Sequence, residues 1–88
     1  MTKVIRFSAS WCGPCKMLAP TFEQLETEFE NVEFETVDID ENRDMVVDYN
    51  IRTVPTVVIE QNGHVLERLV GLQSKNAYEE AINTFKGR

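Results

Sequence analysis

The apolar residues of the first 39 positions change their spacing twice, and this limits the folds open to the chain. Residues 4–7 form a short apolar run with one charge inside it, which predicts a buried strand. Apolar side chains then recur at helical spacing, which predicts a helix from Pro14 to Phe29. Residues 32–39 largely alternate between apolar and polar, as a second strand does. A strand–helix–strand succession requires a parallel strand pair joined by a crossover.

The middle of the chain predicts a short second helix. Residues 41–49 follow Asp40, whose carboxylate suits a helix N-cap. Asn50 comes next, and asparagine tolerates the left-handed backbone conformation in which many helices end.

A hairpin is predicted after this helix. Asn62-Gly63 separates two apolar segments, residues 56–60 and 65–70. Because Asn-Gly is the dipeptide most typical of a two-residue type I′ turn, the two segments are expected to pair antiparallel. Gly71 should end the second strand.

A last helix is predicted after Ser74, which can cap it. The apolar residues that share one face of this helix are Tyr78, Ala81, Ile82 and Phe85. The complete order is β-α-β-α-β-β-α, which predicts an α/β fold with a four-stranded mixed sheet flanked by helices. A chain of 88 residues has room for one hydrophobic core, so a single domain over residues 1–88 is expected.

Charge and composition argue against several classes of function. The net charge is −6 and the pI is about 4.7, whereas binding to nucleic acid needs clustered lysine and arginine. No stretch approaches the ~20 apolar residues of a membrane span, and Arg6 inside the first apolar run is unlike a signal peptide. We therefore expect a soluble, cytoplasmic monomer in a compartment that keeps thiols reduced.

Cys12 and Cys15 are the only cysteines, and they lie where the first predicted strand leads into the first helix. In an α-helix, Cα atoms three residues apart are separated by about 5 Å. A disulfide accepts a Cα separation of roughly 4.4–6.8 Å, so this pair can close and open a bond without moving the backbone. A reversible redox couple has the same requirement.

The two thiols are expected to differ in reactivity. Cys12 lies at the helix N-terminus, where free N–H groups and the helix dipole favour an anion, so its pKa should lie below that of an ordinary thiol. Cys15 lies one turn deeper and should be less exposed and less acidic. Cys12 would then attack a substrate disulfide, and Cys15 would resolve the mixed disulfide by attacking Cys12.

Two structural explanations of the cysteine pair compete with redox chemistry. A disulfide that closes so short a loop removes little entropy from the unfolded chain, so it would stabilise the fold only weakly. A zinc site needs about four ligands, and beyond the two thiols the sequence offers a single histidine, His64, directly after the predicted turn. We therefore expect a redox pair and no bound metal.

Trp11-Cys12-Gly13-Pro14-Cys15-Lys16 resembles the active-site motif of the thioredoxins throughout. Thr53-Val54-Pro55-Thr56 is similar to the substrate-side loop of that family, in which a cis peptide bond precedes the proline. Val70-Gly71 falls at a matching distance further on. The resemblance runs from Val4 onward and covers nearly the whole chain.

The resemblance implies the thioredoxin fold and the reduction of disulfides in proteins. It implies no bound cofactor, since the electrons would come from NADPH through a separate reductase. The residues it suggests as active-site support are Trp11, Gly13, Pro14 and Lys16. The residues it suggests for substrate binding are Trp11, Thr53, Val54, Pro55 and Gly71. A proline that merely starts a strand is the alternative explanation of Pro55.

The sequence also departs from the thioredoxins. Full-length members begin with an extra strand and helix, so this chain corresponds to the minimal form of the fold. Beneath the cysteines the family usually has a buried aspartate and a lysine, where this chain has Arg6 and Thr36. Because a lone charge in a strand core is unfavourable, we expect Arg6 either to pair with Asp38 or to extend to the sheet edge. Near the cysteines, its charge would stabilise a thiolate and make the protein more oxidising than its relatives.

Two other functions remain open. Glutaredoxins, which glutathione recharges, share the short length and Thr53-Val54-Pro55, but they usually carry Pro-Tyr between the cysteines and a glycine-rich stretch where this chain has Gly71-Leu72-Gln73-Ser74. A binding module is the second alternative, in which an apolar platform of Trp11, Val54 and Pro55 docks a partner and the cysteines are incidental. On the leading interpretation, the partners are disulfide-containing proteins and a reductase of the thioredoxin reductase type.

Overall fold

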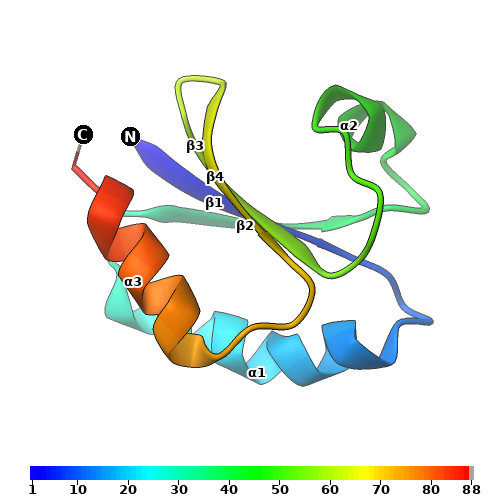
Figure 1. Ribbon diagram of the computed structural model, residues 1–88, viewed down its shortest axis with the longest axis horizontal. Helices are drawn as coiled ribbons and strands as arrows, with labels where there is room; N and C mark the ends of the chain where they lie inside the picture. Colours follow the sequence, from blue (N-terminus) through cyan, green and yellow to red (C-terminus); the bar gives the residue numbers. More distant parts are fainter. Residues whose placement is uncertain (88) are drawn as a thin grey trace.

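The computed structural model describes residues 1–87, which contain three helices and four strands (Figure 1). In chain order these are β1 (Thr2–Ser8), α1 (Gly13–Glu28), β2 (Glu33–Asp38), α2 (Arg43–Asp48), β3 (Thr56–Gln61), β4 (His64–Val70) and α3 (Lys75–Phe85). The order predicted from the sequence is confirmed. Within the described range, no helix combines the length and the apolar character that crossing a membrane requires.

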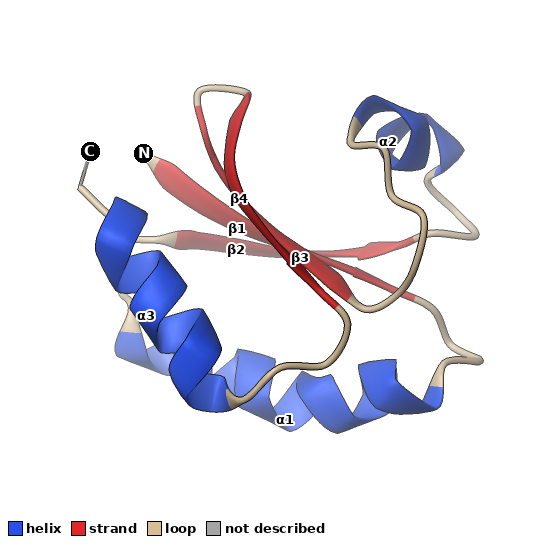
Figure 2. Cartoon of the chain, in the orientation of Figure 1, coloured by secondary structure: helices blue, strands red, loops and turns tan. Residues whose placement is uncertain are grey.

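The strands form one mixed sheet in the order β2-β1-β3-β4 (Figure 2). β1 and β2 run parallel, as the crossover through α1 requires, and their register places Arg6 opposite Thr36 and Ser8 opposite Asp38. β3 pairs antiparallel with both β1 and β4. The loops that follow the parallel strands β1 and β2 therefore leave the sheet at the same end.

Helices cover both faces of the sheet, with α1 and α3 on one side and α2 on the other (Figure 1). Val4 of β1 belongs to the core beneath α1 and α3, while Ile5 and Phe7 belong to the core beneath α2. This division follows from strand geometry, because alternate side chains of a strand point to opposite faces. Arg6 and Ser8 share the face of Val4, so both lie on the α1 side of the sheet.

α3 begins and packs as the sequence predicts. The Ser74 Oγ accepts a hydrogen bond from the Ala77 backbone N–H at 3.2 Å, which is the geometry of a helix N-cap. Tyr78 and Ile82 are fully buried in the core beneath the helix. The predicted apolar face of α3 is therefore the face that contacts the sheet.

The turn residues adopt the backbone conformations predicted from their types. Asn62 and Gly63 have φ angles of 53° and 82°, as two consecutive left-handed residues of a type I′ turn require. Asn50 follows α2 with a φ of 53°, and Gly71 follows β4 with a φ of 79°. These positions end their elements where the sequence predicts.

The predicted cap of α2 is wrong. The helix begins at Arg43 with Asn42 at its N-cap, and no side chain there makes a capping hydrogen bond. Asp40 lies before the helix, and its carboxylate accepts a hydrogen bond from the Trp11 indole instead. The Trp11 indole, which is distant in sequence, thus binds the Asp40 carboxylate that the local pattern assigned to the N-terminus of α2.

Candidate active site

Cys12 and Cys15 form a disulfide at the start of α1, just after the loop that follows β1. Their Cα atoms are 5.2 Å apart, which agrees with the separation predicted from helix geometry. Cys12 is the N-cap residue, and Pro14 occupies the first turn, where its missing N–H breaks no helical hydrogen bond. The start of the helix therefore holds the two sulfurs within reach of each other.

The sulfur of Cys12 receives a hydrogen bond from its own helix. The backbone N–H of Cys15 donates to Cys12 Sγ at 3.2 Å. This N–H is one of those that a helix N-terminus leaves without a backbone partner, and it favours negative charge on the sulfur once the disulfide is reduced. This hydrogen bond is the feature that would favour a thiolate at Cys12.

Both cysteines are buried, with 6% of Cys12 and 2% of Cys15 exposed to solvent. They form a small cluster with Ala9, and Ile39 and Val54 pack against it. Cys15 is the less exposed of the pair, as the sequence predicts. That burial suits a thiol whose reaction partner is its neighbour in the helix rather than a molecule from solution.

The loop before β3 borders the disulfide. The Val54–Pro55 peptide bond is cis, as the family resemblance implies, and the Val54 carbonyl oxygen lies 3.8 Å from Cys12 Sγ. The Gly71 N–H donates to the Pro55 carbonyl at 2.8 Å, which ties the residue after β4 to this loop. The fold therefore brings Val54, Pro55 and Gly71 together from two separate parts of the sequence.

Trp11 precedes the disulfide, and 66% of it is exposed. Its indole N–H donates to Asp40 Oδ2 at 2.9 Å, which holds the ring against the loop after β2. Sequence reasoning misses Asp40 as a site residue. The signal that could have found it is topological, because residues that follow adjacent parallel strands meet at one edge of a sheet.

An apolar pocket of about 250 Å³ lies beside Trp11. The residues that form most of its lining are Trp11, Ile39, Val46, Ile51, Thr53 and Val54. Sequence reasoning misses Ile39, Val46 and Ile51, because an apolar residue in a predicted strand or helix is most simply explained as core. The pocket shows that these three residues also shape the surface next to the disulfide.

Arg6 reaches across the sheet toward the edge strand β2. Its Nε and Nη2 donate to Thr36 Oγ1 at 3.3 and 3.1 Å, and its guanidinium lies 4.8 Å from the centre of the Phe22 ring. The expected extension to the sheet edge is confirmed. The expected ion pair with Asp38 is wrong: the ion pairs among residues 1–87 involve other groups, and the residue directly opposite Arg6 in the parallel register, Thr36, takes that place.

Arg6 also lines a second pocket of about 260 Å³, which we call the rear pocket. Its lining includes Arg6, Ser8, Cys15, Lys16, Thr36 and Asp38. Cys15 is part of this lining, whereas Cys12 is not. The two residues of the disulfide therefore differ in their neighbours, since Cys12 Sγ borders the Val54 carbonyl and Cys15 lines a charged pocket.

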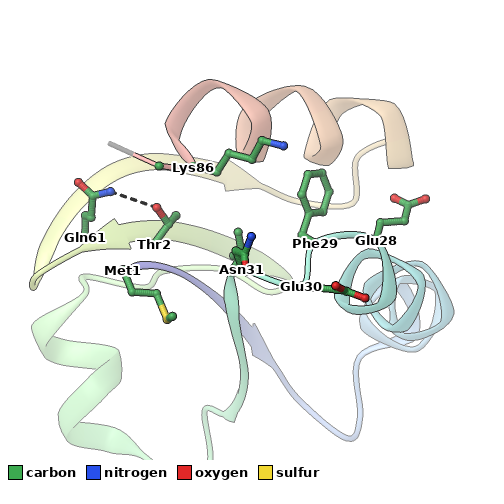
Figure 3. Close-up of a pocket in the computed structure, with 10 residues that line it drawn as sticks. Met1, Thr2, Glu28, Phe29, Glu30, Asn31, Gln61 and Lys86 are labelled. Atoms are coloured by element: carbon green, nitrogen blue, oxygen red, sulfur yellow. Dashed lines mark hydrogen bonds between the residues drawn. The ribbon is translucent and has the colours of Figure 1, made fainter.

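A larger pocket of about 550 Å³ lies at the opposite end of the sheet, where β1 begins and α1 ends (Figure 3). Phe29 and Lys86 border it, with Lys86 Nζ 5.3 Å from the centre of the Phe29 ring. None of the site residues predicted from the sequence lines this pocket. Across residues 1–87, no group of three or more histidine, cysteine or acidic side chains is placed to hold a metal ion.

Comparison with known proteins agrees with this geometry. A sequence model of the family Thioredoxin matches residues 1–84. Thioredoxin of Bacillus subtilis (strain 168) is 38% identical over 78 residues, which cover 88% of this chain and 75% of that protein.

Solved structures of thioredoxins and a related protein superpose closely on this chain. The X-ray structure of Fasciola hepatica thioredoxin has a TM-score of 0.91 and 35% identity, covering 97% of this chain and 81% of its own. A structure that concerns the thiol resolving mechanism of a yeast mitochondrial 1-Cys peroxiredoxin via glutathione/thioredoxin systems has a TM-score of 0.89 and 31% identity, covering 96% and 78%. The chain belongs to the thioredoxin family, and it is a thiol–disulfide oxidoreductase whose redox pair is Cys12 and Cys15.

Proposed function

We propose that Cys12 is the attacking thiol and Cys15 the resolving thiol in the reduction of protein disulfides. In the first step the Cys12 thiolate attacks a substrate disulfide, forms a mixed disulfide and releases one substrate thiolate. In the second step the Cys15 thiolate attacks Cys12 Sγ, forms the Cys12–Cys15 disulfide and releases the second substrate thiolate. Two electrons pass from the protein to the substrate, and the protein ends in the oxidised form.

One observation carries this assignment of roles. The Cys15 N–H donates to Cys12 Sγ at 3.2 Å, so Cys12 is the sulfur on which the helix stabilises negative charge. Cys12 also borders the Val54 carbonyl, at the loop where a substrate chain would arrive. Cys15 lines the rear pocket and has its reaction partner in the same helical turn.

The substrate-binding surface is expected to consist of Trp11, Thr53, Val54, Pro55 and Gly71. An extended substrate segment would lie along Val54 and pair with its backbone, as an added strand does. The apolar pocket beside Trp11 has room for one substrate side chain. At Gly71 the surface is open, since an added Cβ would meet no atom within 4 Å. These features support the binding of a protein chain rather than a compact small molecule.

The remaining residues of the motif have a supporting role in this proposal. Gly13, Pro14 and Lys16 are exposed in the first turn of α1, around the buried sulfurs. Gly13 and Pro14 complete the turn that sets the Cys12–Cys15 spacing, and Lys16 adds a cation next to Cys15. Arg6 belongs to the same support from the side of the sheet.

We infer the redox partners from membership of the family. Electrons would come from NADPH through a separate reductase of the thioredoxin reductase type, and no cofactor would be bound to this chain. The substrates would be disulfide-containing proteins. A solved structure with a similar fold supports this proposal, because it concerns the thiol resolving mechanism of a peroxiredoxin. In this proposal the chain works as one cytoplasmic, monomeric domain over residues 1–88, with neither nucleic acid nor membrane as a partner.

Reduction of insulin disulfides by dithiothreitol tests the proposal. The wild-type protein should accelerate the reaction, and Cys12→Ser should abolish the acceleration. A Cys12→Ser, Cys15→Ser variant that keeps full biological activity would instead identify a binding module. Supplying either NADPH with thioredoxin reductase or glutathione with its reductase then identifies the electron donor, and recharging by glutathione alone would contradict the thioredoxin-type route.

A further inference from the structure

We propose that Arg6, acting through the rear pocket, is a positioning residue for the resolving step, in which its guanidinium stabilises the thiolate of Cys15. This inference rests on the proposed roles of Cys12 and Cys15. It assigns the charge of Arg6 to the second step of the exchange, whereas the helix N-terminus acts on Cys12 in the first.

The first argument is the position of the pocket. Arg6 and Cys15 line the same cavity of about 260 Å³, and Cys12 does not. Cys15 and Phe22 lie seven residues apart on α1, which is about 10 Å along the helix axis. Since the guanidinium packs over Phe22, it lies about two helical turns from Cys15 on the same side of the helix. That separation is slightly longer than the screening length of ~8 Å at physiological salt, but Cys15 is buried and Arg6 is half-buried, and salt screens such a pair much less than an exposed one.

The second argument is that the charge is fixed in place. Thr36 Oγ1 accepts two hydrogen bonds from the guanidinium, and the Phe22 ring supports its face. Burial lowers the pKa of Arg6, which the nearby carboxylates of Glu23 and Glu26 oppose. Arginine nevertheless stays protonated at any pH at which the protein is folded. The rear pocket therefore contains a permanent positive charge.

The third argument is the balance of charge around Cys15. Arg6 comes from β1, Lys16 from α1 and Asp38 from β2, and all three line the pocket. Glu23 and Glu26 lie further along α1 than Phe22 and also act on the guanidinium, but neither lines the pocket. Two cations and one carboxylate thus surround the cavity next to the thiol. This balance favours the thiolate over the thiol.

The rear pocket also has room for water that can accept the proton of the Cys15 thiol. A volume of about 260 Å³ has room for several waters, since each takes ~30 Å³. In the resolving step the Cys15 thiol loses its proton to this water, and its sulfur forms a bond to Cys12 Sγ. The bond between Cys12 and the substrate sulfur breaks, and the substrate leaves with the electron pair as a thiolate.

The two steps can be separated with the chromogenic disulfide 5,5′-dithiobis(2-nitrobenzoate). The reduced protein should release one thionitrobenzoate when Cys12 reacts and a second when Cys15 resolves the mixed disulfide. Arg6→Met removes the charge and keeps an apolar stem, and Arg6→Lys keeps the charge. Lys3→Met is the matched control, because it removes a cation from the same strand but outside the rear pocket.

Arg6→Met should raise the pH midpoint of the second release by about one unit and slow that release roughly three-fold at pH 7, because the more basic thiolate is also the better nucleophile and offsets part of the loss. The first release should stay within about two-fold of wild type, because helix N–H groups rather than Arg6 stabilise Cys12. Arg6→Lys and Lys3→Met should both resemble wild type. A second release that is equally affected by Lys3→Met, or lost equally in Arg6→Lys, would overturn the inference.

A second measurement isolates Cys15. In a Cys12→Ser background, alkylation of Cys15 by iodoacetamide across a pH series should show a higher midpoint when Arg6 is methionine. Arg6→Gln replaces Arg6→Met if circular dichroism shows that the latter is unfolded, and an unchanged midpoint overturns the inference. If the wild-type protein stops after the first release, the proposed role of Cys15 itself is contradicted. If the wild-type protein completes both releases and the Arg6 variants do so equally fast, only this inference is contradicted.

Discussion

The indole N–H of Trp11 donates to the carboxylate of Asp40 at 2.9 Å, and this hydrogen bond joins the loops that follow β1 and β2. With 66% of the tryptophan exposed, packing alone leaves the ring free to turn. The bond therefore sets the orientation of the aromatic face next to the disulfide. It also makes the loop after β2 part of the active site.

Replacing Asp40 by alanine should release the Trp11 ring. We expect KM for a protein disulfide to rise about three-fold with little change in kcat, which corresponds to about 0.65 kcal/mol, because this hydrogen bond is exposed and contributes less than the ~1.5–3 kcal/mol of a hydrogen bond to a charged group. The emission spectrum of the sole tryptophan should change in parallel. Asp40→Asn keeps an acceptor oxygen and should stay close to wild type; identical spectra for all three proteins would show that the bond does not orient the ring.

Replacing Cys15 by serine should trap the first intermediate. Cys12 would still attack a substrate disulfide, but no thiol would remain to displace the substrate, so turnover should stop after one event. Mass spectrometry should then detect a covalent adduct with the substrate, which dithiothreitol removes. Cys12→Ser should give no such adduct, and an adduct at Cys15 instead would reverse the proposed roles.

Tyr49 should make the fold sensitive to alkaline pH. Its hydroxyl donates to the buried carboxylate of Glu60, and burial together with that carboxylate raises the pKa of Tyr49 to about 12. An unfolded tyrosine titrates near pH ~10, so the stabilisation is complete below that pH and is lost as the pH rises toward 12. Urea unfolding at pH 9 and pH 11 should therefore show a larger loss of stability in wild type than in Tyr49→Phe. Equal losses would rule out this contribution.

Ser74→Ala should weaken the start of α3. The substitution removes the oxygen that accepts from the Ala77 N–H, and loss of such a cap destabilises a protein by about 1 kcal/mol. Chemical denaturation should show a lower midpoint with an unchanged slope. Ser74→Asp retains a capping oxygen and should preserve most of the stability, so a variant as unstable as the alanine protein would contradict the cap.

Several features of the fold could be predicted because they depend on neighbouring residues alone. Asn62-Gly63 selects its turn through the conformations that asparagine and glycine tolerate, and the structure shows both in the left-handed region. The Cys12–Cys15 spacing is likewise a property of one helical turn. Local preferences and tertiary structure agree at these positions, so the sequence is sufficient.

Other features depended on groups far apart in the chain. Asp40 has the local features of a helix cap, but the Trp11 indole 29 residues away competes for the same carboxylate. The partner of Arg6 could not be chosen between Asp38 and the sheet edge, because the choice depends on how far a flexible side chain reaches over Phe22. Tertiary competition of this kind is absent from any local pattern.

β1 is hydrogen-bonded to a neighbour on each side and supplies side chains to both cores. A strand in that position should be the last part of the fold to open, so its amide protons should exchange with deuterated solvent more slowly than those of the two edge strands. The chain leads from this strand to the reactive sulfurs in only a few residues. Each redox cycle can therefore break and remake the Cys12–Cys15 bond close to the end of a rigid strand, while the hydrogen bonds of β1 stay intact.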